Sequence, residues 1–244
     1  MTERRKREGR LWDVWTRRKQ YDRPGMKRYY QIRDRNQAWL VASAREVLTE
    51  KIDARTLKTD LWNEGKKNER FFMDSPGINF GIDISGQVCR LAKEKAGGRL
   101  RVVNASIGFL PFRPQSFDLI LDISTIDHFD EPEHAIKKYC RILKPQGVVL
   151  IVADNPFYLG FPVLQMQSFF KLHVPFKAFP PSRIRRACEG AGLRVVRSFY
   201  TYLHLPAFIA YFLEERRLLD RINQGRNVLW NIGKKYVVVL ARKV

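Results

Sequence analysis

The strongest constraint on the fold of this chain is an alternation of short apolar runs with segments of helical periodicity. Five such runs are Arg55–Leu61, Ile78–Ile84, Leu100–Asn104, Phe117–Ile123 and Gly147–Ala153. Runs of this length are typical of buried strands, and their alternation with helices predicts a parallel sheet with crossover helices. Two further strands are expected near the C-terminus, at Leu193–Phe199 and Tyr236–Ala241.

The expected helices have recognisable ends. Apolar residues recur at helical spacing from about residue 34 to residue 50. Ser85 is a typical N-cap for a second helix, and Pro132 suits the first turn of a third, which Pro145 is expected to end. Ser182 is expected to cap a fourth.

Charge divides the chain into two predicted parts. Lys and Arg exceed Asp and Glu by 45 minus 25, a net charge of +20, which favours nucleic acid or an anionic membrane surface as a neighbour. Residues 1–33 interleave basic and aromatic residues and are predicted to be a basic arm before a single domain at residues 34–244. The arm could grip RNA through phosphates and stacking, or pack its aromatics on the domain.

Cysteine usage and hydropathy bear on the compartment. The three cysteines lie far apart without a CxxC pair, so neither a disulfide framework nor a metal site is predicted. The charged N-terminus is followed by no apolar segment of a secretory signal, and no uncharged stretch reaches the length of a spanning helix. We therefore expect a cytoplasmic protein and leave association with a membrane surface open.

Several ordered segments together resemble the class I S-adenosylmethionine-dependent methyltransferase family, in its small-molecule branch. They are GIDIS at 81–85, LPFRPQSFDLILD at 110–122, DHFDEPEHA at 127–135, RILKPQGVVLIV at 141–152 and IRRACEGAGLRVV at 184–196. The resemblance implies an α/β, Rossmann-like, doubly wound fold. Its seven-stranded sheet would be mainly parallel, with helices on both faces and an antiparallel last strand.

The same resemblance implies residues that bind the adenosine part of S-adenosylmethionine. Asp83, at the end of the second strand, would accept hydrogen bonds from the ribose hydroxyls, and Ile84 would face the adenine. Asp83 is also suited to interact with the N-terminus of the helix that follows it. Ser106 stands where the family often has an acid against the adenine, and Ile107 would pack on the ring.

The first loop departs from the family pattern. The family has an acid and a GxGxG turn after the first strand, whereas this chain reads LKTDLWNEG at residues 57–65. Glycine there permits close approach of the backbone to the methionine part of the cofactor. Without it, Thr59, Asp60 and Glu64 are the candidates to hold that part, with an acid facing the cofactor's ammonium group.

Candidate catalytic residues follow the fourth strand. Asp127 and His128 lie at the rim where open α/β sheets place their chemistry, and His128 has a suitable ordinary pKa to accept a proton. A packed, hydrogen-bonded histidine is the alternative. Asp122, at the strand end, is expected to face the cofactor crevice.

Two aromatic segments, residues 156–180 and 200–232, are predicted to cover the substrate. Their composition suits a small apolar or lipid-like methyl acceptor, although packing on the sheet would explain it equally. The leading hypothesis is a methyltransferase. The alternatives are a cofactor-free binding or scaffolding protein, which the missing glycines favour, and an RNA-binding protein or RNA methyltransferase, which the charge favours.

Overall fold

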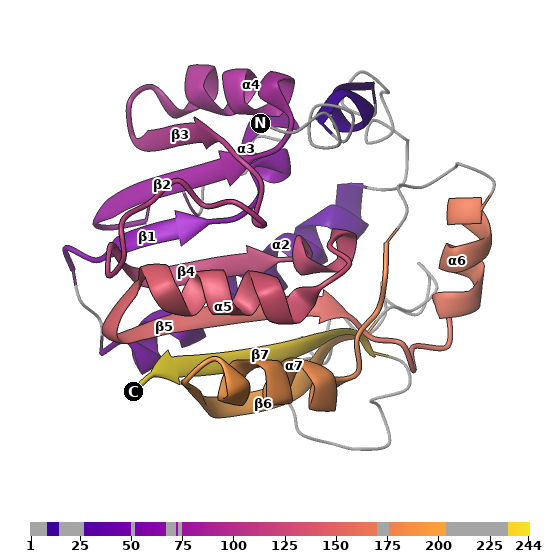
Figure 1. The fold of residues 1–244 in the computed structure, drawn as a ribbon. Coiled ribbons are helices and arrows are strands. Elements are labelled where there is room, and N and C mark those ends of the chain that lie inside the picture. Colours follow the sequence, from indigo (N-terminus) through magenta and orange to yellow (C-terminus); the bar gives the residue numbers. More distant parts are fainter. Residues whose placement is uncertain are drawn as a thin grey trace.

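The computed structural model describes residues 9–14, 27–49, 52–66, 72, 75–169, 176–203 and 234–244. Its centre is a seven-stranded sheet with the strand order β3-β2-β1-β4-β5-β7-β6. The strands are β1 (Arg55–Lys58), β2 (Ile78–Asp83), β3 (Leu100–Asn104), β4 (Phe117–Ile123), β5 (Leu143–Asp154), β6 (Leu193–Leu203) and β7 (Lys234–Lys243). Neighbours from β3 to β5 are parallel, and β7 runs antiparallel to both β5 and β6 (Figure 1). The predicted mainly parallel sheet is confirmed.

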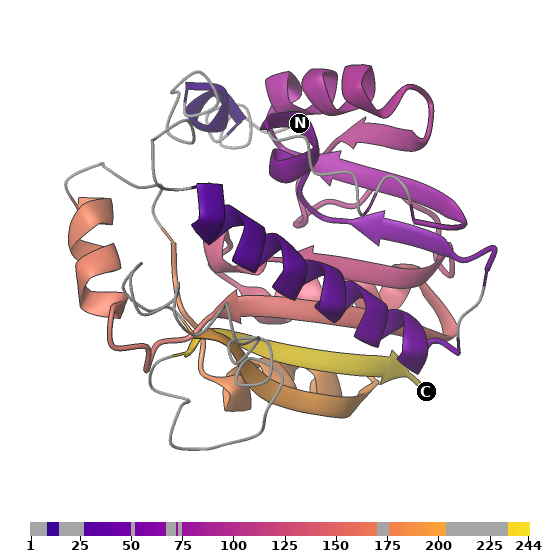
Figure 2. The ribbon, with the colours of Figure 1, turned by 180° about the vertical axis from the view of Figure 1, so that it is seen from behind.

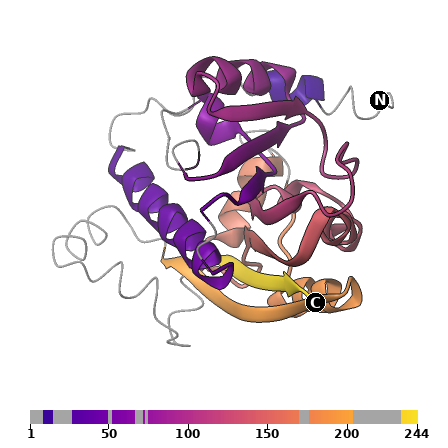
Figure 3. The same cartoon turned by 90° about the vertical axis from the view of Figure 1, so that its left-hand side faces the viewer.

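Helices cover both faces of the sheet. They are α2 (Lys27–Val47), α3 (Trp62–Lys66), α4 (Gly86–Ala96), α5 (Pro132–Ile142), α6 (Phe161–Phe169) and α7 (Pro181–Gly190), with the 3-10 helix η1 (Ile126–His128). Figure 1 shows α5 and α7 on one face, and Figures 2 and 3 show α2 lying across the other. Residues 9–14 are also helical and lie near α4.

Alternation along the strands builds a separate core on each face. Successive side chains of a strand point to opposite sides of the sheet. Accordingly, Leu119 and Leu121 of β4 belong to the cluster with α2 and α4, whereas Ile120 belongs to the cluster with α5 and α7. All three side chains are fully buried. The continuous apolar strands of the sequence are therefore explained by burial on both faces.

Some element boundaries differ from those predicted. α2 begins at Lys27, inside the predicted basic arm, because Lys and Arg are good helix formers and no Gly or Pro interrupts residues 27–47. Ser85 caps α4 as predicted, its Oγ accepting from the Val88 N–H at 3.1 Å. The predicted cap at Ser182 is wrong, since α7 begins at Pro181 and its N-cap, Pro180, makes no side-chain bond.

The predicted stop at Pro145 is also displaced. α5 already ends at Ile142, and β5 begins at Leu143, so that Pro145 lies inside the strand. The pairing of β5 with β4 shifts register there, between Phe117 and Leu119 of β4. A proline is tolerated at such an irregularity because no ladder hydrogen bond needs its missing N–H.

Candidate functional site

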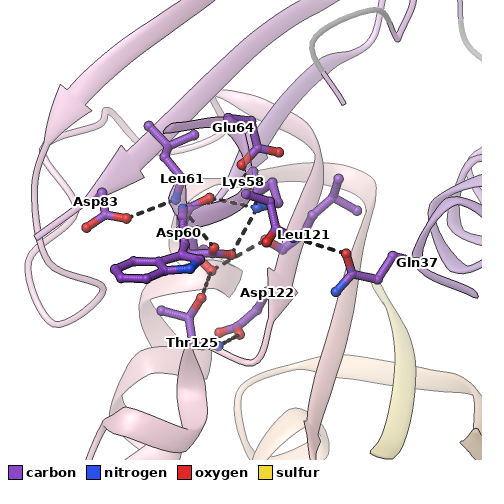
Figure 4. Close-up of polar contacts among 12 residues, drawn as sticks. Gln37, Lys58, Asp60, Leu61, Glu64, Asp83, Leu121, Asp122 and Thr125 are labelled. Carbon is purple, nitrogen blue, oxygen red and sulfur yellow. Dashed lines mark hydrogen bonds and ion pairs between the residues drawn. The ribbon is translucent and has the colours of Figure 1, made fainter. Parts of the chain in front are cut away.

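The order of the strands puts the switch point of the sheet between β1 and β4, and we call the region beyond the carboxyl ends of these two strands the crevice. The chain proceeds from β1 outward to β2 and β3 and then returns to β4, on the other side of β1. In open α/β sheets, ligands bind beyond the carboxyl ends of the strands at such a switch point. The loops that follow β1, β2 and β4 bring most of the predicted site residues together at this edge (Figure 4).

A buried lysine organises the loop after β1. Lys58, the last residue of β1, has no exposed surface, and its Nζ donates to the Asp60 carbonyl at 2.9 Å. The same Nζ donates to Asp60 Oδ2 at 3.1 Å and to Glu64 Oε2 at 3.0 Å (Figure 4). These three bonds use all the donors of the ammonium. The two acids predicted to face a cofactor's ammonium are thus paired with an ammonium of this chain.

Burial and charge act in opposite directions within this group. Burial opposes the charge of Lys58, but the Asp60 and Glu64 carboxylates outweigh it and raise the lysine pKa. Burial raises the pKa of Glu64 to about 7, and Lys58 offsets that effect only in part. Among the described residues, Glu64 Oε1 is buried without a hydrogen-bond partner. One oxygen of Glu64 therefore keeps an unused capacity to accept a hydrogen bond.

Sequence reasoning did not single out Lys58. The available signal was a lysine inside an otherwise apolar strand, with acids two and six residues later. A lysine is rarely buried without a partner. That spacing could have predicted the ion pairs. The three hydrogen bonds of the Lys58 ammonium depend on the path of the chain from β1 into α3.

Leu61 fills space that a glycine would leave open. Its side chain is fully buried and lies over Gly81 of β2, where a Cβ would come within 2.3 Å of Leu61 Cδ2. The absence of a side chain at Gly81 thus accommodates the leucine in the loop after β1. In this chain the glycine that allows close packing is therefore Gly81 on β2, not a glycine in the loop after β1.

Asp83 ends β2 and lies under the same loop. Its Oδ2 accepts from the Leu61 N–H at 3.0 Å, its Oδ1 accepts from the Ser85 N–H at 2.8 Å, and its exposed fraction is 9%. Burial raises its pKa to about 7, against the lowering by these two bonds. The expected interaction of Asp83 with the start of α4 is present. The carboxylate still has lone pairs that could accept hydrogen bonds from a ribose.

The remaining adenosine candidates lie in the loops after β2 and β3. Ile84 follows Asp83 and is half-buried. Ser106 accepts from the Gly108 N–H through its Oγ at 3.3 Å, and Ile107 is buried in the core cluster beside α5. Their roles toward a ligand, like that of Asp83, stay predictions.

Asp122 holds the loop after β4. It is fully buried; its Oδ1 accepts from the Thr125 and Ile126 N–H groups at 3.1 Å each, and its Oδ2 accepts from Tyr139 at 2.6 Å. Burial raises its pKa to about 6, although these bonds lower it. Thr125 also receives a 2.9 Å bond from the Thr59 hydroxyl, which joins the loops after β1 and β4. Cofactor binding by Asp122 and Thr59 stays a prediction.

Asp127 and His128 are neighbours in η1 with different surroundings. Asp127 is 1% exposed, and both its oxygens accept from the Asp154 N–H at 3.1 Å. Burial first, and then the charge of Asp154, raise its pKa well above the usual range. His128 is exposed and meets the ring of Trp12 edge-on, with the ring centroids 4.9 Å apart. Their catalytic roles stay predictions, with His128 alone of the two at the surface.

The described part of the chain contains no group of three His, Cys, Asp or Glu side chains arranged to hold a metal ion. Within the same residues, no helix combines the length and the apolar character needed to cross a membrane.

Comparison with known proteins gives this geometry a context. Residues 68–151 match the family model described as a methyltransferase domain. The ubiquinone/menaquinone biosynthesis C-methyltransferase of Geotalea daltonii is 32% identical over 98 residues, covering 38% of this chain and 42% of that protein. The chain spans less than half the length of the curated relatives that it matches.

Solved structures extend the likeness of fold to most of the chain. A crystal structure of a sarcosine dimethylglycine methyltransferase candidate from Galdieria sulphuraria has a TM-score of 0.63 at 18% identity, covering 91% of each chain. The [4+2]-cyclase SpnF has a TM-score of 0.59 at 17% identity, covering 84% of this chain and 80% of SpnF. At this level of identity, these matches show the fold alone.

Proposed function

We propose that this chain, which carries a methyltransferase domain at residues 68–151 within the class I methyltransferase fold, transfers a methyl group to a small apolar acceptor. The domain implies S-adenosylmethionine as the cofactor. The observation that carries the proposal is Asp83, which lies inside the matched segment at the end of β2, bordering the crevice. An acid at this place is suited to accept hydrogen bonds from a ribose.

The residues present fit the adenosine part of the cofactor. Each oxygen of Asp83 accepts one backbone N–H and keeps a lone pair for a ribose hydroxyl. Ile84 and the Ser106 hydroxyl come from the adjoining loops and would adjoin the adenine. These groups support binding of a nucleoside at the outer part of the crevice.

The loop after β1 offers the methionine part of the cofactor different surroundings from those of a glycine-rich loop. Leu61 fills the space over Gly81, and Lys58 already engages Asp60 and Glu64. The groups left for an amino-acid tail are the Asp60 side chain, which is 23% exposed, and the unpartnered Oε1 of Glu64. We expect the cofactor's ammonium to share these acids with Lys58.

The bound cofactor would supply a methyl group on a positively charged sulfur, open to direct displacement by a nucleophilic atom of the acceptor. This chain's residues would chiefly align the two molecules, an effect that accounts for much of the rate of such reactions. The loop after β4, held in place by Asp122, borders the switch point between β1 and β4. His128 on that loop is exposed and is our candidate to accept a proton from the acceptor.

An apolar acceptor is supported by the segment after β5. Phe157, Leu159 and Phe169 are large apolar side chains with exposed fractions of 61%, 75% and 82%. They lie on and before α6, which stands beyond the carboxyl edge of the sheet (Figure 1). The Geotalea daltonii relative is named for quinone biosynthesis, which agrees with a lipid-like acceptor. Membrane-surface and nucleic-acid partners stay predictions.

Calorimetric titration with S-adenosylhomocysteine tests the proposal. At pH 8.5, where Asp83 with its pKa of about 7 is mostly ionised, we expect wild-type protein to bind and Asp83→Asn to bind about 10- to 100-fold more weakly, because hydrogen bonds to a charged group contribute about 1.5–3 kcal/mol. Asp53→Asn is the matched control, since Asp53 is exposed in the turn before β1. Equal affinities of all three proteins would contradict the assignment of Asp83.

A cofactor-free binding protein is the second candidate. It is favoured by the pairing of Lys58 with Asp60 and Glu64, because the chain's own ammonium stands where the cofactor's ammonium was expected. The SpnF match also illustrates that this fold does not dictate a single reaction. This candidate predicts no rise in melting temperature with millimolar S-adenosylhomocysteine. A ligand that binds only the native state would raise it by mass action.

A further inference from the structure

Residues 9–14 lie across the crevice and contact the loops that surround it. In Figures 1 and 3, this short helix lies near α4, at the end of the sheet where the parallel strands finish. The contacts come from three of its residues: Gly9, Trp12 and Asp13. They reach the loops after β1, β2 and β4, which are the loops that hold the candidate site.

Asp13 anchors this segment beside Asp83. Its Oδ1 accepts from the Ser85 hydroxyl at 2.5 Å and from the Gln87 N–H at 3.2 Å. Both groups belong to the first turn of α4 or its cap, where a negative charge is favoured by the unpaired backbone N–H groups. Asp13 therefore gives the segment a specific attachment, two residues beyond the Asp83 carboxylate.

Trp12 spans the mouth of the crevice. Its ring centroid lies 6.0 Å from that of Trp62, the first residue of α3, and 4.9 Å from that of His128, the last residue of η1. Both contacts are edge-on, a favourable geometry for aromatic rings. A single side chain thus contacts both α3, which follows β1, and η1, which follows β4.

Gly9 brings the backbone of the segment against the loop after β2. A Cβ at this position would lie 2.9 Å from the Ile84 carbonyl oxygen and 3.9 Å from Ile84 Cγ1. Ile84 is the residue expected to face an adenine. The backbone of Gly9 is therefore too close to Ile84 for a side chain at position 9. This contact lies where the adenine of the cofactor is expected to bind.

Together these contacts place the segment next to the candidate ribose ligand, whose own bonds go to the Leu61 and Ser85 N–H groups. Asp83 is 9% exposed, while Ser85 beside it is fully buried and bonded to Asp13. The segment contacts Ile84 and Ser85, which follow Asp83 directly, so a nucleoside bound to Asp83 and Ile84 would overlap with it. We propose that residues 9–14 are an intramolecular strap that occupies the nucleoside part of the crevice and must be released before the cofactor binds. The competition with cofactor rests on the proposed function, whereas the docking of the strap does not.

The test compares binding of S-adenosylhomocysteine by wild-type protein, Asp13→Ala and Trp12→Ala. Leu11→Ala and Val14→Ala are matched controls, because both residues lie on the same segment with exposed side chains. If roughly nine-tenths of the free protein is docked, release of the strap tightens apparent binding roughly tenfold. We expect that gain in Asp13→Ala and Trp12→Ala and unchanged affinity in the controls.

Hydrogen exchange without ligand provides a second measurement. The Gln87 amide, which donates to Asp13, should exchange faster in Asp13→Ala than in wild type, while amides of the β4–β5 ladder should not change. Unchanged exchange at Gln87 would overturn the docking itself. This readout also shows whether the variant keeps its folded core.

The two proposals fail in different ways. If every protein binds S-adenosylhomocysteine with equal affinity, or if Asp13→Ala and Trp12→Ala bind more weakly, the strap does not compete and the inference is overturned while the proposed function stands. If no protein binds, the proposed function fails. The strap is then supported or overturned by the exchange of Gln87 alone.

Discussion

Replacing Lys58 by methionine tests whether the buried ammonium holds the loop after β1. Methionine keeps an unbranched side chain and removes the charge, along with three hydrogen bonds to Asp60 and Glu64. Removing one partner of a buried ion pair typically costs about 3–5 kcal/mol, because the other charge is left without compensation. For a domain whose whole stability is about 5–15 kcal/mol, that loss is large.

The pH sets the size of the loss. Glu64, with a pKa of about 7, is mostly ionised at pH 8.5 and mostly protonated at pH 5.5. We expect Lys58→Met to lose about 3–5 kcal/mol at the higher pH. At the lower pH, the two hydrogen bonds from Lys58 to Asp60 are the main loss, and about 1.5–3 kcal/mol is expected.

Urea unfolding at the two pH values, followed by circular dichroism, measures these free energies. Adding Glu64→Gln to Lys58→Met should recover at least about 1 kcal/mol at pH 8.5, because the uncompensated carboxylate is gone. Lys93→Met is the control, since Lys93 is exposed on α4, and it should change stability by less than about 0.5 kcal/mol. A loss in Lys58→Met below about 1 kcal/mol at pH 8.5, or no recovery in the double variant, would refute this account.

Three further outcomes are expected in the same assay. Gly81→Ala should cost about 1–3 kcal/mol by overpacking, and less when Leu61→Ala is already present, because the added methyl then enters vacated space; a fully additive double variant would contradict the contact. Tyr139→Phe should cost about 1.5–3 kcal/mol and raise the pKa of Asp122 above about 6, since a 2.6 Å bond to the carboxylate is lost; carboxyl titration by NMR checks the pKa. Asp83 should make stability fall as pH rises from 4 to 7, because the folded state holds its proton to about pH 7 against an ordinary pKa of 3.8. A pKa shift of about 3 units corresponds to a loss of about 4 kcal/mol in stability over this pH range. Asp83→Asn should abolish this loss. An unchanged pH profile of stability in the variant would show that the Asp83 carboxyl does not titrate as described.

Local patterns were sufficient for the sheet and for most of its helices. Runs of apolar residues located the strand centres because burial on both faces of a parallel sheet leaves a continuous apolar signal in the sequence. The Ser85 cap was also predictable, since its bond to Val88 depends only on residues close in sequence. Pro145 and Ser182 misled the prediction because their positions depend on how a strand or helix is paired and packed, which short-range propensity does not specify.

The sequence by itself determined a mainly parallel α/β sheet and marked Asp83, Asp122 and the glycine-poor loop as residues at its carboxyl edge. Tertiary structure alone decided what those residues contact. It paired Glu64 with Lys58 and brought Asp13 to the cap of α4, more than seventy residues away in the chain. The physical reason is that periodicity reports which side of an element is buried, whereas an ion pair or a docked segment depends on distances between elements that are set only when the loops close around the sheet.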